Sequence, residues 1–266
     1  MKEAVLPSLK YKEQKPKLIL ERKIPYEGFT SEQEKKVNNQ LKTIGLPLDN
    51  VTRIRYRPNQ KGTENVLGSF KPYDGVFTLY KSLEKFPPVA QQGTMIHELT
   101  HASSPFDPKN EKLYGGKESM KQSRDFVLAV AQQTDITRKY LSGYHAYLHK
   151  QLLKGQIDER RFVEETHAIL VEQRFVNPAH LAQVEAAQHE KMKEKGIEPV
   201  QLVSKQKYGK EVALSGLDNT IMKLIPGMNN YDDLENHIRK VRESVAPAGK
   251  KPIVIFPQEH VLKNLA

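Results

Sequence analysis

The stretch that decides the fold, residues 89–103, reads VAQQGTMIHELTHAS and follows two prolines. Apart from one glutamate, its residues carry no formal charge when histidine is neutral. Proline suits the first turn of a helix, and a nearly uncharged helix with one polar stripe is typical of a buried element. The stretch therefore predicts a helix packed in the core, with its few ionisable side chains close together.

Three of those side chains, His97, Glu98 and His101, form the pattern HExxH. Residues four apart lie on the same face of a helix, so the two imidazoles can bind one ion with the tetrahedral geometry of zinc. Glu98 directly follows the first histidine and can reach a water molecule on the metal without being a ligand. Zinc lowers the pKa of such a water towards about 7, and the carboxylate can accept its proton. The motif predicts a zinc hydrolase with Glu98 as general base and then acid.

Residues 94–102 resemble the active-site helix of the zincin metallopeptidases. The resemblance implies a zincin-like fold, in which a small sheet precedes the helix, and a bound Zn²⁺ ion. It also implies that the edge strand of that sheet pairs with an extended peptide substrate by strand addition. The segment GVFTLY at 75–80 is rich in β-branched and aromatic residues, and we expect its residues 76–80 to be that edge strand.

A zinc enzyme of this kind needs a third protein ligand, with water in the fourth position. Residues 162–173, FVEETHAILVEQ, are similar to the glutamate-bearing helix of gluzincins, especially of bacterial toxin and effector zincins. Those proteins show the pattern Glu-Glu-x-x-Ala-x-x-x-Glu-Asn/Gln, and the resemblance implies that Glu165 is the ligand and that Ala168 allows close helix packing. Glu172 lies two turns after Glu165 on the same face, where it could orient a ligating histidine.

Two other carboxylates compete for the third position. Glu111, Tyr114 and Gly115 are similar to the Asp-x-x-Tyr-Gly segment of aspzincins, in which the tyrosine stabilises the oxyanion. This resemblance implies Glu111 as ligand and Tyr114 as catalytic residue, although a glutamate stands where that family has aspartate. Asp107 could supply a carboxylate from the same loop. Because HExxH is not continued as HExxHxxGxxH, a metzincin ligand set is not expected, and we prefer Glu165 for its longer motif match.

Further candidates lie outside these motifs. Tyr144, Tyr147 and His145 are weaker choices for a donor to the oxyanion. His145 and His149 repeat the i, i+4 spacing without a glutamate directly after the first histidine, so we interpret them as ordinary helix residues. Alternating arginines after residue 51 predict a solvated strand face; they are Arg53, Arg55 and Arg57.

Strand patterns gather in the first third of the chain and helical patterns dominate the rest, which predicts an α+β fold with a small N-terminal sheet beside a mainly helical part. The expected helices cover 30–44, 89–103, 118–133, 136–152, 158–175, 178–194 and 231–245, and the expected strands cover 51–56, 65–70, 75–80 and 253–256. We divide the chain into an N-terminal extension with one helix (1–50), a zincin-like catalytic core (51–176) and a mainly helical C-terminal region (177–266) that could belong to the same domain.

Composition restricts the chemistry further. The 266 residues include no cysteine, which excludes disulfides, Cys-ligated zinc, iron–sulfur clusters and thiol catalysis. The formal charge of +10 is compatible with an acidic protein partner or with nucleic acid, of which the second is not favoured. No segment is long and apolar enough to span a membrane, and no apolar segment of a secretory signal peptide is expected at the N-terminus.

These features predict a zinc-dependent endopeptidase that hydrolyses a protein or peptide substrate, which could be a host protein with an acidic surface. The effector-like motif favours a bacterial effector or toxin, secreted or translocated without a conventional signal peptide; otherwise the protein is expected to be cytoplasmic. The alternative is a basic module that binds nucleic acid or protein and carries an inactive HExxH helix.

Overall fold

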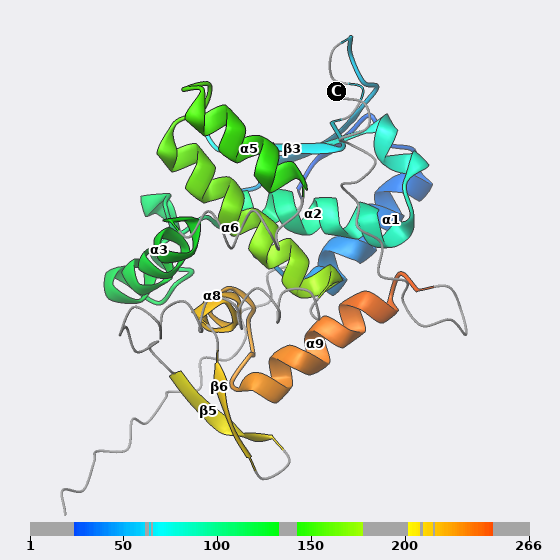
Figure 1. The fold of residues 1–266 in the computed structure, drawn as a ribbon. Helices are drawn as coiled ribbons and strands as arrows, with labels where there is room; N and C mark the ends of the chain where they lie inside the picture. Colours follow the sequence, from blue (N-terminus) through cyan, green and yellow to red (C-terminus); the bar gives the residue numbers. More distant parts are fainter. Residues whose placement is uncertain are drawn as a thin grey trace, which may run out of the picture.

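The computed structural model describes residues 24–61, 64, 66–132, 143–177, 202–207, 210–214 and 216–246. Within these ranges the chain forms seven α-helices, a four-stranded sheet and a two-stranded hairpin (Figure 1). The prediction of a small sheet beside a mostly helical body is confirmed. The helix expected at 178–194 and the strand expected at 253–256 lie outside the described residues.

The four-stranded sheet has the strand order β1-β2-β4-β3. Strands β1 (Tyr26–Glu27), β2 (Arg53–Arg57) and β4 (Val76–Tyr80) run parallel, whereas β3 (Gly68–Lys71) pairs antiparallel with β4 and forms one edge. The expectation that 76–80 is the edge strand is therefore wrong. All residues of β4 except the last are buried, and a strand with buried residues on both faces belongs in the interior of a sheet.

Helix α1 (Ser31–Ile44) begins and ends close to where the sequence predicts. Thr30 Oγ1 accepts a hydrogen bond from Gln33 N at 3.2 Å, and the Gln33 side chain accepts one from Thr30 N at 2.9 Å, which together form a capping box. Gly45 ends the helix with a φ of 73°, a left-handed conformation that glycine adopts without strain. The helix packs against α2 and α9.

Helix α2 (Pro88–Ala102) carries the HExxH motif and lies between β3 and α6 (Glu159–Val176) (Figure 1). A proline occupies the first turn of α2, as predicted, and Asp158 caps α6 by accepting a hydrogen bond from Arg161 N at 2.7 Å. Every residue of α6 after Arg161 is buried except Glu164, so α6 is a central helix. Ala168 is fully buried, as its small size in a close helix contact requires.

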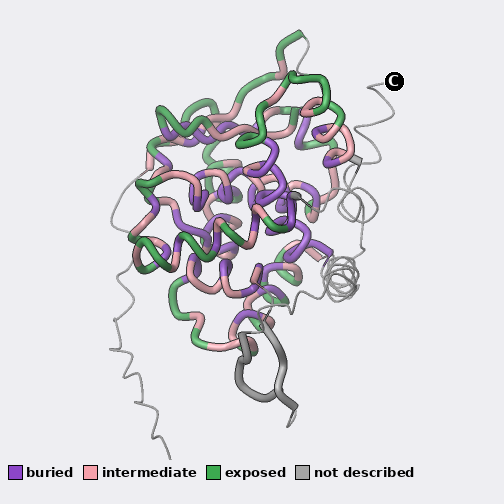
Figure 2. The backbone as a smooth tube through the Cα atoms, turned by 60° about the vertical axis from the view of Figure 1, so that its left-hand side comes forward, coloured by how far each residue is buried: buried purple, intermediate pink, exposed green. Residues whose placement is uncertain are grey.

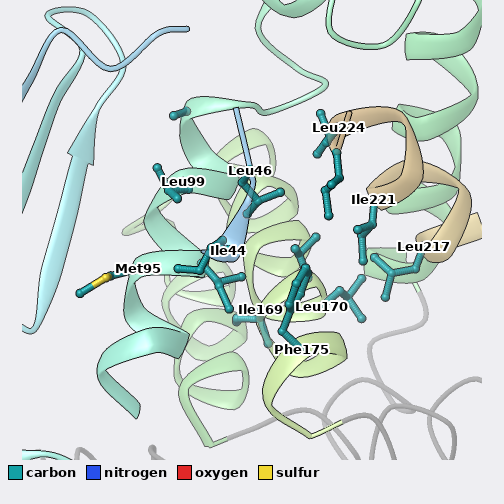
Figure 3. Packing of buried hydrophobic residues seen from close by; sticks show 14 of the residues in the cluster. Ile44, Leu46, Met95, Leu99, Ile169, Leu170, Phe175, Leu217, Ile221 and Leu224 are labelled. Atoms are coloured by element: carbon teal, nitrogen blue, oxygen red, sulfur yellow. The ribbon is translucent and has the colours of Figure 1, made fainter. Parts of the chain in front are cut away.

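The core between the helices is apolar. Figure 3 shows Leu99 of α2, Ile169 and Phe175 of α6 and Ile221 of α8 (Gly216–Leu224) among the side chains that fill it. In Figure 2 the buried parts of the backbone gather in the middle of the molecule and the exposed parts lie around them. None of the described helices is long and apolar enough to cross a membrane.

Three of the remaining elements are helices that pack against α6, and the other two are strands that form a hairpin. They are α3 (Lys117–Gln132), α5 (Gly143–Leu153), α9 (Tyr231–Glu243) and the hairpin of β5 (Leu202–Lys207) and β6 (Lys210–Leu214). The sequence analysis did not predict α8 or the hairpin, and residues 136–142 of the helix expected at 136–152 lie outside the described part.

A buried arginine ties α6 to the C-terminal helices. Arg174 Nε donates to Asp218 Oδ1 of α8 at 2.6 Å, and the same guanidinium pairs with Glu235 of α9. The two carboxylates raise the pKa of Arg174 further, although burial lowers it. The helix that bears the predicted third ligand is thus held from behind by residues more than forty positions away in the sequence.

Candidate metal centre

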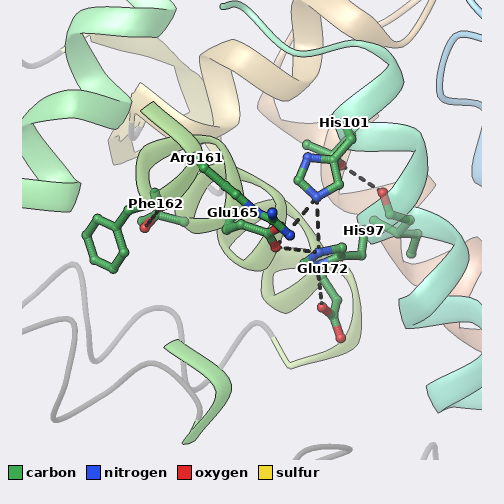
Figure 4. Close-up of polar contacts among 9 residues, drawn as sticks. His97, His101, Arg161, Phe162, Glu165 and Glu172 are labelled. Atoms are coloured by element: carbon green, nitrogen blue, oxygen red, sulfur yellow. Dashed lines mark hydrogen bonds and ion pairs between the residues drawn. The ribbon is translucent and has the colours of Figure 1, made fainter. Parts of the chain in front are cut away.

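His97 and His101 of α2 face Glu165 of α6 across the contact between the two helices (Figure 4). Their Nε2 atoms are 3.3 Å apart, and Glu165 Oε2 lies 3.4 Å from His97 Nε2 and 3.6 Å from His101 Nε2. Zinc bonds of about 2.0–2.1 Å at tetrahedral angles place neighbouring ligand atoms about 3.3–3.4 Å apart. The triangle of ligand atoms therefore has nearly the size that one zinc ion requires.

The chemistry of the donor set also fits a metal ion. Glu165 Oε2 is buried and makes no hydrogen bond of good geometry within the described residues, which is costly unless a cation compensates it. Burial raises the pKa of Glu165, but the nearby imidazoles of His101 and His97 prevail and hold it well below its usual value. The group therefore offers an ionised carboxylate and two imidazoles, a combination found in catalytic zinc sites.

A second carboxylate supports the first histidine. Glu172 Oε2 lies 3.2 Å from His97 Nδ1. A carboxylate at that nitrogen keeps the ring proton on Nδ1, which leaves the lone pair of Nε2 for a metal. Burial lowers the pKa of His97, but its contacts with Glu165 and Glu172 outweigh burial and raise the pKa well above its usual value. Without metal, His97 therefore keeps an additional proton to higher pH than a free imidazole does, and an incoming ion competes with that proton.

Glu98 lies on the side of α2 that approaches the edge strand β3. The backbone N–H of Phe70, in that strand, lies close enough to the Glu98 carboxylate to influence its pKa. Burial raises the pKa of Glu98, and the opposing charges of His97 and His101 do not cancel that effect. A carboxylate whose pKa is raised in this way can take up a proton closer to neutral pH.

The structure does not bring the aspzincin-like candidates to the cluster. The Tyr114 ring is buried, and its hydroxyl donates a 2.8 Å hydrogen bond to the carbonyl of Ser103, which secures the loop after α2. Asp107 accepts a hydrogen bond from a backbone N–H two residues later and caps a short 3₁₀ helix, and Glu111 follows that helix. Neither carboxylate belongs to the group of potential ligands in the described part of the chain.

A different tyrosine lies beside the cluster. The ring of Tyr144, on α5, has its centroid 6.5 Å from that of His97. Burial raises its pKa most, and the charges of Glu165 and Glu98 raise it further, so the hydroxyl keeps its proton. Tyr147 stacks on it with a centroid distance of 6.3 Å. Tyr144 was only a weak candidate because it belongs to no motif.

The second histidine pair is separate from this centre. His145 Nε2 lies 3.1 Å from Thr166 Oγ1, and burial lowers the pKa of His145 to about 4. The ring of His149 packs near Phe162, with centroids 5.8 Å apart. Neither histidine belongs to the group of potential metal ligands among the described residues.

Arg161 was not singled out from the sequence, yet it approaches the cluster. Its Nε lies 4.0 Å from Glu165 Oε1, and its side chain is 66% exposed. The i, i+4 spacing to a predicted ligand is the signal that could have identified it. Two of the three arginines of β2, Arg53 and Arg55, instead form surface ion pairs with Glu27, at 2.8 and 2.6 Å.

Comparison with known proteins adds no family to this description. No protein-family model matches the chain, and no similar curated protein or solved structure was found. Any function inferred for this chain therefore rests on the arrangement of the side chains around His97.

Proposed function

We propose that the chain is a zinc metallopeptidase that hydrolyses peptide bonds of a protein substrate, with His97, His101 and Glu165 as metal ligands. The observation that carries the proposal is the spacing of 3.3–3.6 Å among their three ligand atoms. Two helices bring these polar groups together in a largely buried place, where they are costly unless an ion compensates them. The position of Glu98 directly after the first ligand supports proton transfer as the chemistry.

Each residue of the centre has a role in that reaction. A zinc ion held here would polarise the substrate carbonyl and lower the pKa of a coordinated water towards about 7. Glu98 accepts the proton of the attacking water and passes it to the leaving amine, and its raised pKa supports the second step. Glu172 holds His97 in the tautomer that binds metal. Tyr144, whose ring lies beside that of His97, is the proposed donor of a hydrogen bond to the developing oxyanion.

Among the described strands, β3 pairs only with β4, and its outer edge is the proposed site for the substrate backbone. The carbonyls of Leu67 and Lys71 accept hydrogen bonds from β4 and the turn before it, so the alternate residues Gly68 and Phe70 direct their backbone groups away from the sheet. An extended peptide can add to such an edge through main-chain hydrogen bonds. This assigns strand addition to β3 in place of 76–80.

The edge also suggests where the substrate side chains lie. A peptide antiparallel to β3 would place its N-terminal part at the C-terminal end of that strand. A cavity of about 190 Å³ lies there, with Phe70, Tyr73 and Asp107 in its wall. We propose that it receives side chains on the N-terminal side of the cleaved bond.

The partner and location of the enzyme follow from weaker features. The charge of +10 supports a protein substrate with an acidic surface. The similarity of residues 162–173 to effector zincins supports an effector or toxin that acts on a target cell.

Metal content and cleavage of the purified chain test the proposed function. Wild-type protein should carry about one zinc per chain and cleave members of a peptide library. Glu98→Gln should keep the zinc and lose at least about 10²-fold in kcat, whereas Glu165→Gln should lose the zinc. Glu111→Gln, which changes the competing carboxylate, is the matched control and should alter neither. Wild-type protein without stoichiometric zinc would contradict the proposal, and salt-sensitive nucleic-acid binding by that protein would favour the basic binding module.

A further inference from the structure

Two glycines, one in the HExxH helix and one in the strand beside it, are not explained by their backbone conformation. Gly45 and Gly75 have φ values of 73° and 68°, which favour glycine. Gly68 lies in β3 and Gly93 in α2, and neither has a positive φ. Other residues could adopt these conformations, so the reason for glycine at 68 and 93 is the space that a side chain would occupy.

At Gly93 that space belongs to the carboxylate that supports His97. A Cβ atom at this position would lie 3.1 Å from Glu172 Oε1, 3.5 Å from Glu172 Cγ and 3.4 Å from Val176 Cγ1. Gly93 stands one helical turn before His97, so Glu172 reaches Nδ1 of that ring by passing over the glycine. A side chain at 93 requires Glu172 Oε1 to shift by a few tenths of an ångström, and the other oxygen of that carboxylate makes the 3.2 Å contact with His97 Nδ1.

At Gly68 the space is occupied by Thr94 and by Glu98, the general base of the proposed mechanism. A Cβ atom there would lie 2.8 Å from Thr94 Cγ2 and 3.0 Å from Glu98 Cγ, closer than packed atoms tolerate. The same strand brings the backbone N–H of Phe70 close to the Glu98 carboxylate. A side chain at 68 must therefore either move Thr94 and shift Glu98 by a few tenths of an ångström, or move the strand itself.

We infer that Gly93 and Gly68 are positioning residues that fix two carboxylates beside the histidines, Glu172 of α6 and Glu98 of α2. Gly93 sets Glu172 against His97 and so controls metal affinity. Gly68 sets Glu98 against β3 and so controls the rate of proton transfer. This inference rests on the proposed zinc peptidase function and assigns the two effects to different residues.

The role of Gly93 is tested by the zinc affinity, which is measured by competition with a chromophoric chelator and without any substrate. Gly93→Ala should bind zinc about 10–100-fold more weakly than wild type, the range for lost support of a ligating histidine. Alanine favours a helix more than glycine does, so weaker binding would not reflect a weaker α2. In the double variant Gly93→Ala/Glu172→Ala, the shorter side chain at 172 leaves space for the methyl group at 93. The zinc affinity of this variant should therefore equal that of Glu172→Ala.

The Gly68 arm is tested by kinetics in the zinc-loaded protein. Gly68→Ala should keep its zinc and lose about 10²-fold in kcat, with a smaller change in KM. If the glycine acts through Glu98, adding Gly68→Ala to Glu98→Gln should cause no further loss. Two results would overturn this role and assign Gly68 to substrate binding. One is a rise in KM with an unchanged kcat, and the other is a loss of activity that multiplies with the loss caused by Glu98→Gln.

The outcomes separate this inference from the proposed function. A wild-type chain that binds no zinc would remove the peptidase proposal itself. A wild-type chain that binds zinc, together with a Gly93→Ala variant of equal affinity, would overturn only the role of Gly93. Additive losses in the Gly93 and Glu172 double variant would do the same, because they would show that the two residues act independently.

Discussion

Zinc should stabilise the folded chain more strongly as pH rises. The pKa of His97 in the metal-free cluster is raised above its unfolded value of about 6.5. Protonation of His97 therefore stabilises the metal-free fold fully below that unfolded value, and this contribution is lost as pH rises through the folded pKa. Zinc binding has the opposite dependence because the ion must displace the proton.

The size of the effect can be worked out from one displaced proton. It changes the apparent zinc affinity about tenfold per pH unit, or about 1.4 kcal/mol, while His97 stays protonated in the metal-free state. Free zinc at about 1,000 times its Kd stabilises the fold by about 4.1 kcal/mol. A chain of this size gains about 2–4 °C in Tm per kcal/mol. Zinc at that saturation should thus raise Tm by about 8–16 °C, and each pH unit should change the shift by about 3–6 °C.

Thermal unfolding in chelator-buffered zinc between about pH 6 and pH 8 measures this dependence. Glu165→Gln, which lacks an ionised third ligand, should show no zinc-dependent shift at any of these pH values. His149→Gln is the matched control at a histidine outside the cluster and should keep both the shift and its pH dependence. A wild-type shift that is constant or shrinks as pH rises would refute the assignment of the displaced proton to His97.

Three further substitutions, at two tyrosines and at the buried arginine of α6, have measurable outcomes. Tyr144→Phe should keep its zinc and lose about 10²-fold in kcat, since the oxyanion loses a donor; an unchanged kcat would exclude this role. Tyr114→Phe should leave kcat and zinc content unchanged but lower the free energy of unfolding in urea by about 1–3 kcal/mol, because the Ser103 carbonyl loses its donor; a large kcat loss would contradict that. Arg174→Ala should lower the free energy of unfolding by about 3–5 kcal/mol, because Asp218 stays buried without its cation, and a change within about 1 kcal/mol would show that the network is unimportant.

Short-range spacing explains why the potential ligands could be predicted. The HExxH pattern places His97 and His101 on one face of a helix whatever surrounds it, and the helix with Glu165 carries its own recognisable pattern. Only the meeting of the two helices remained to be established, and the structure confirms that the three side chains lie together. The ends of α1 were predictable for the same reason, because Thr30 and Gly45 act within a few positions of themselves.

Features that depend on distant contacts could not be predicted in this way. Strands β3 and β4 both have strand patterns, but their order in the sheet depends on which partners meet in space, and the more apolar segment became the interior strand. Tyr114 and Tyr144 show the same limit, because packing alone decides which hydroxyl meets the Ser103 carbonyl and which ring lies beside His97. Glycines 68 and 93 gave no signal, since their importance lies in neighbours on other elements.

The anchoring of α6 by the C-terminal helices has a practical consequence for anyone who wishes to shorten this protein. A fragment that stops at residue 176 would contain His97, His101 and Glu165 but would leave Ile169 and Phe175 without Leu217 and Ile221, which belong to the same core cluster. A shortened protein should therefore extend at least through residue 246. We expect that substitutions within 216–246 can weaken zinc binding without changing any of the potential ligands.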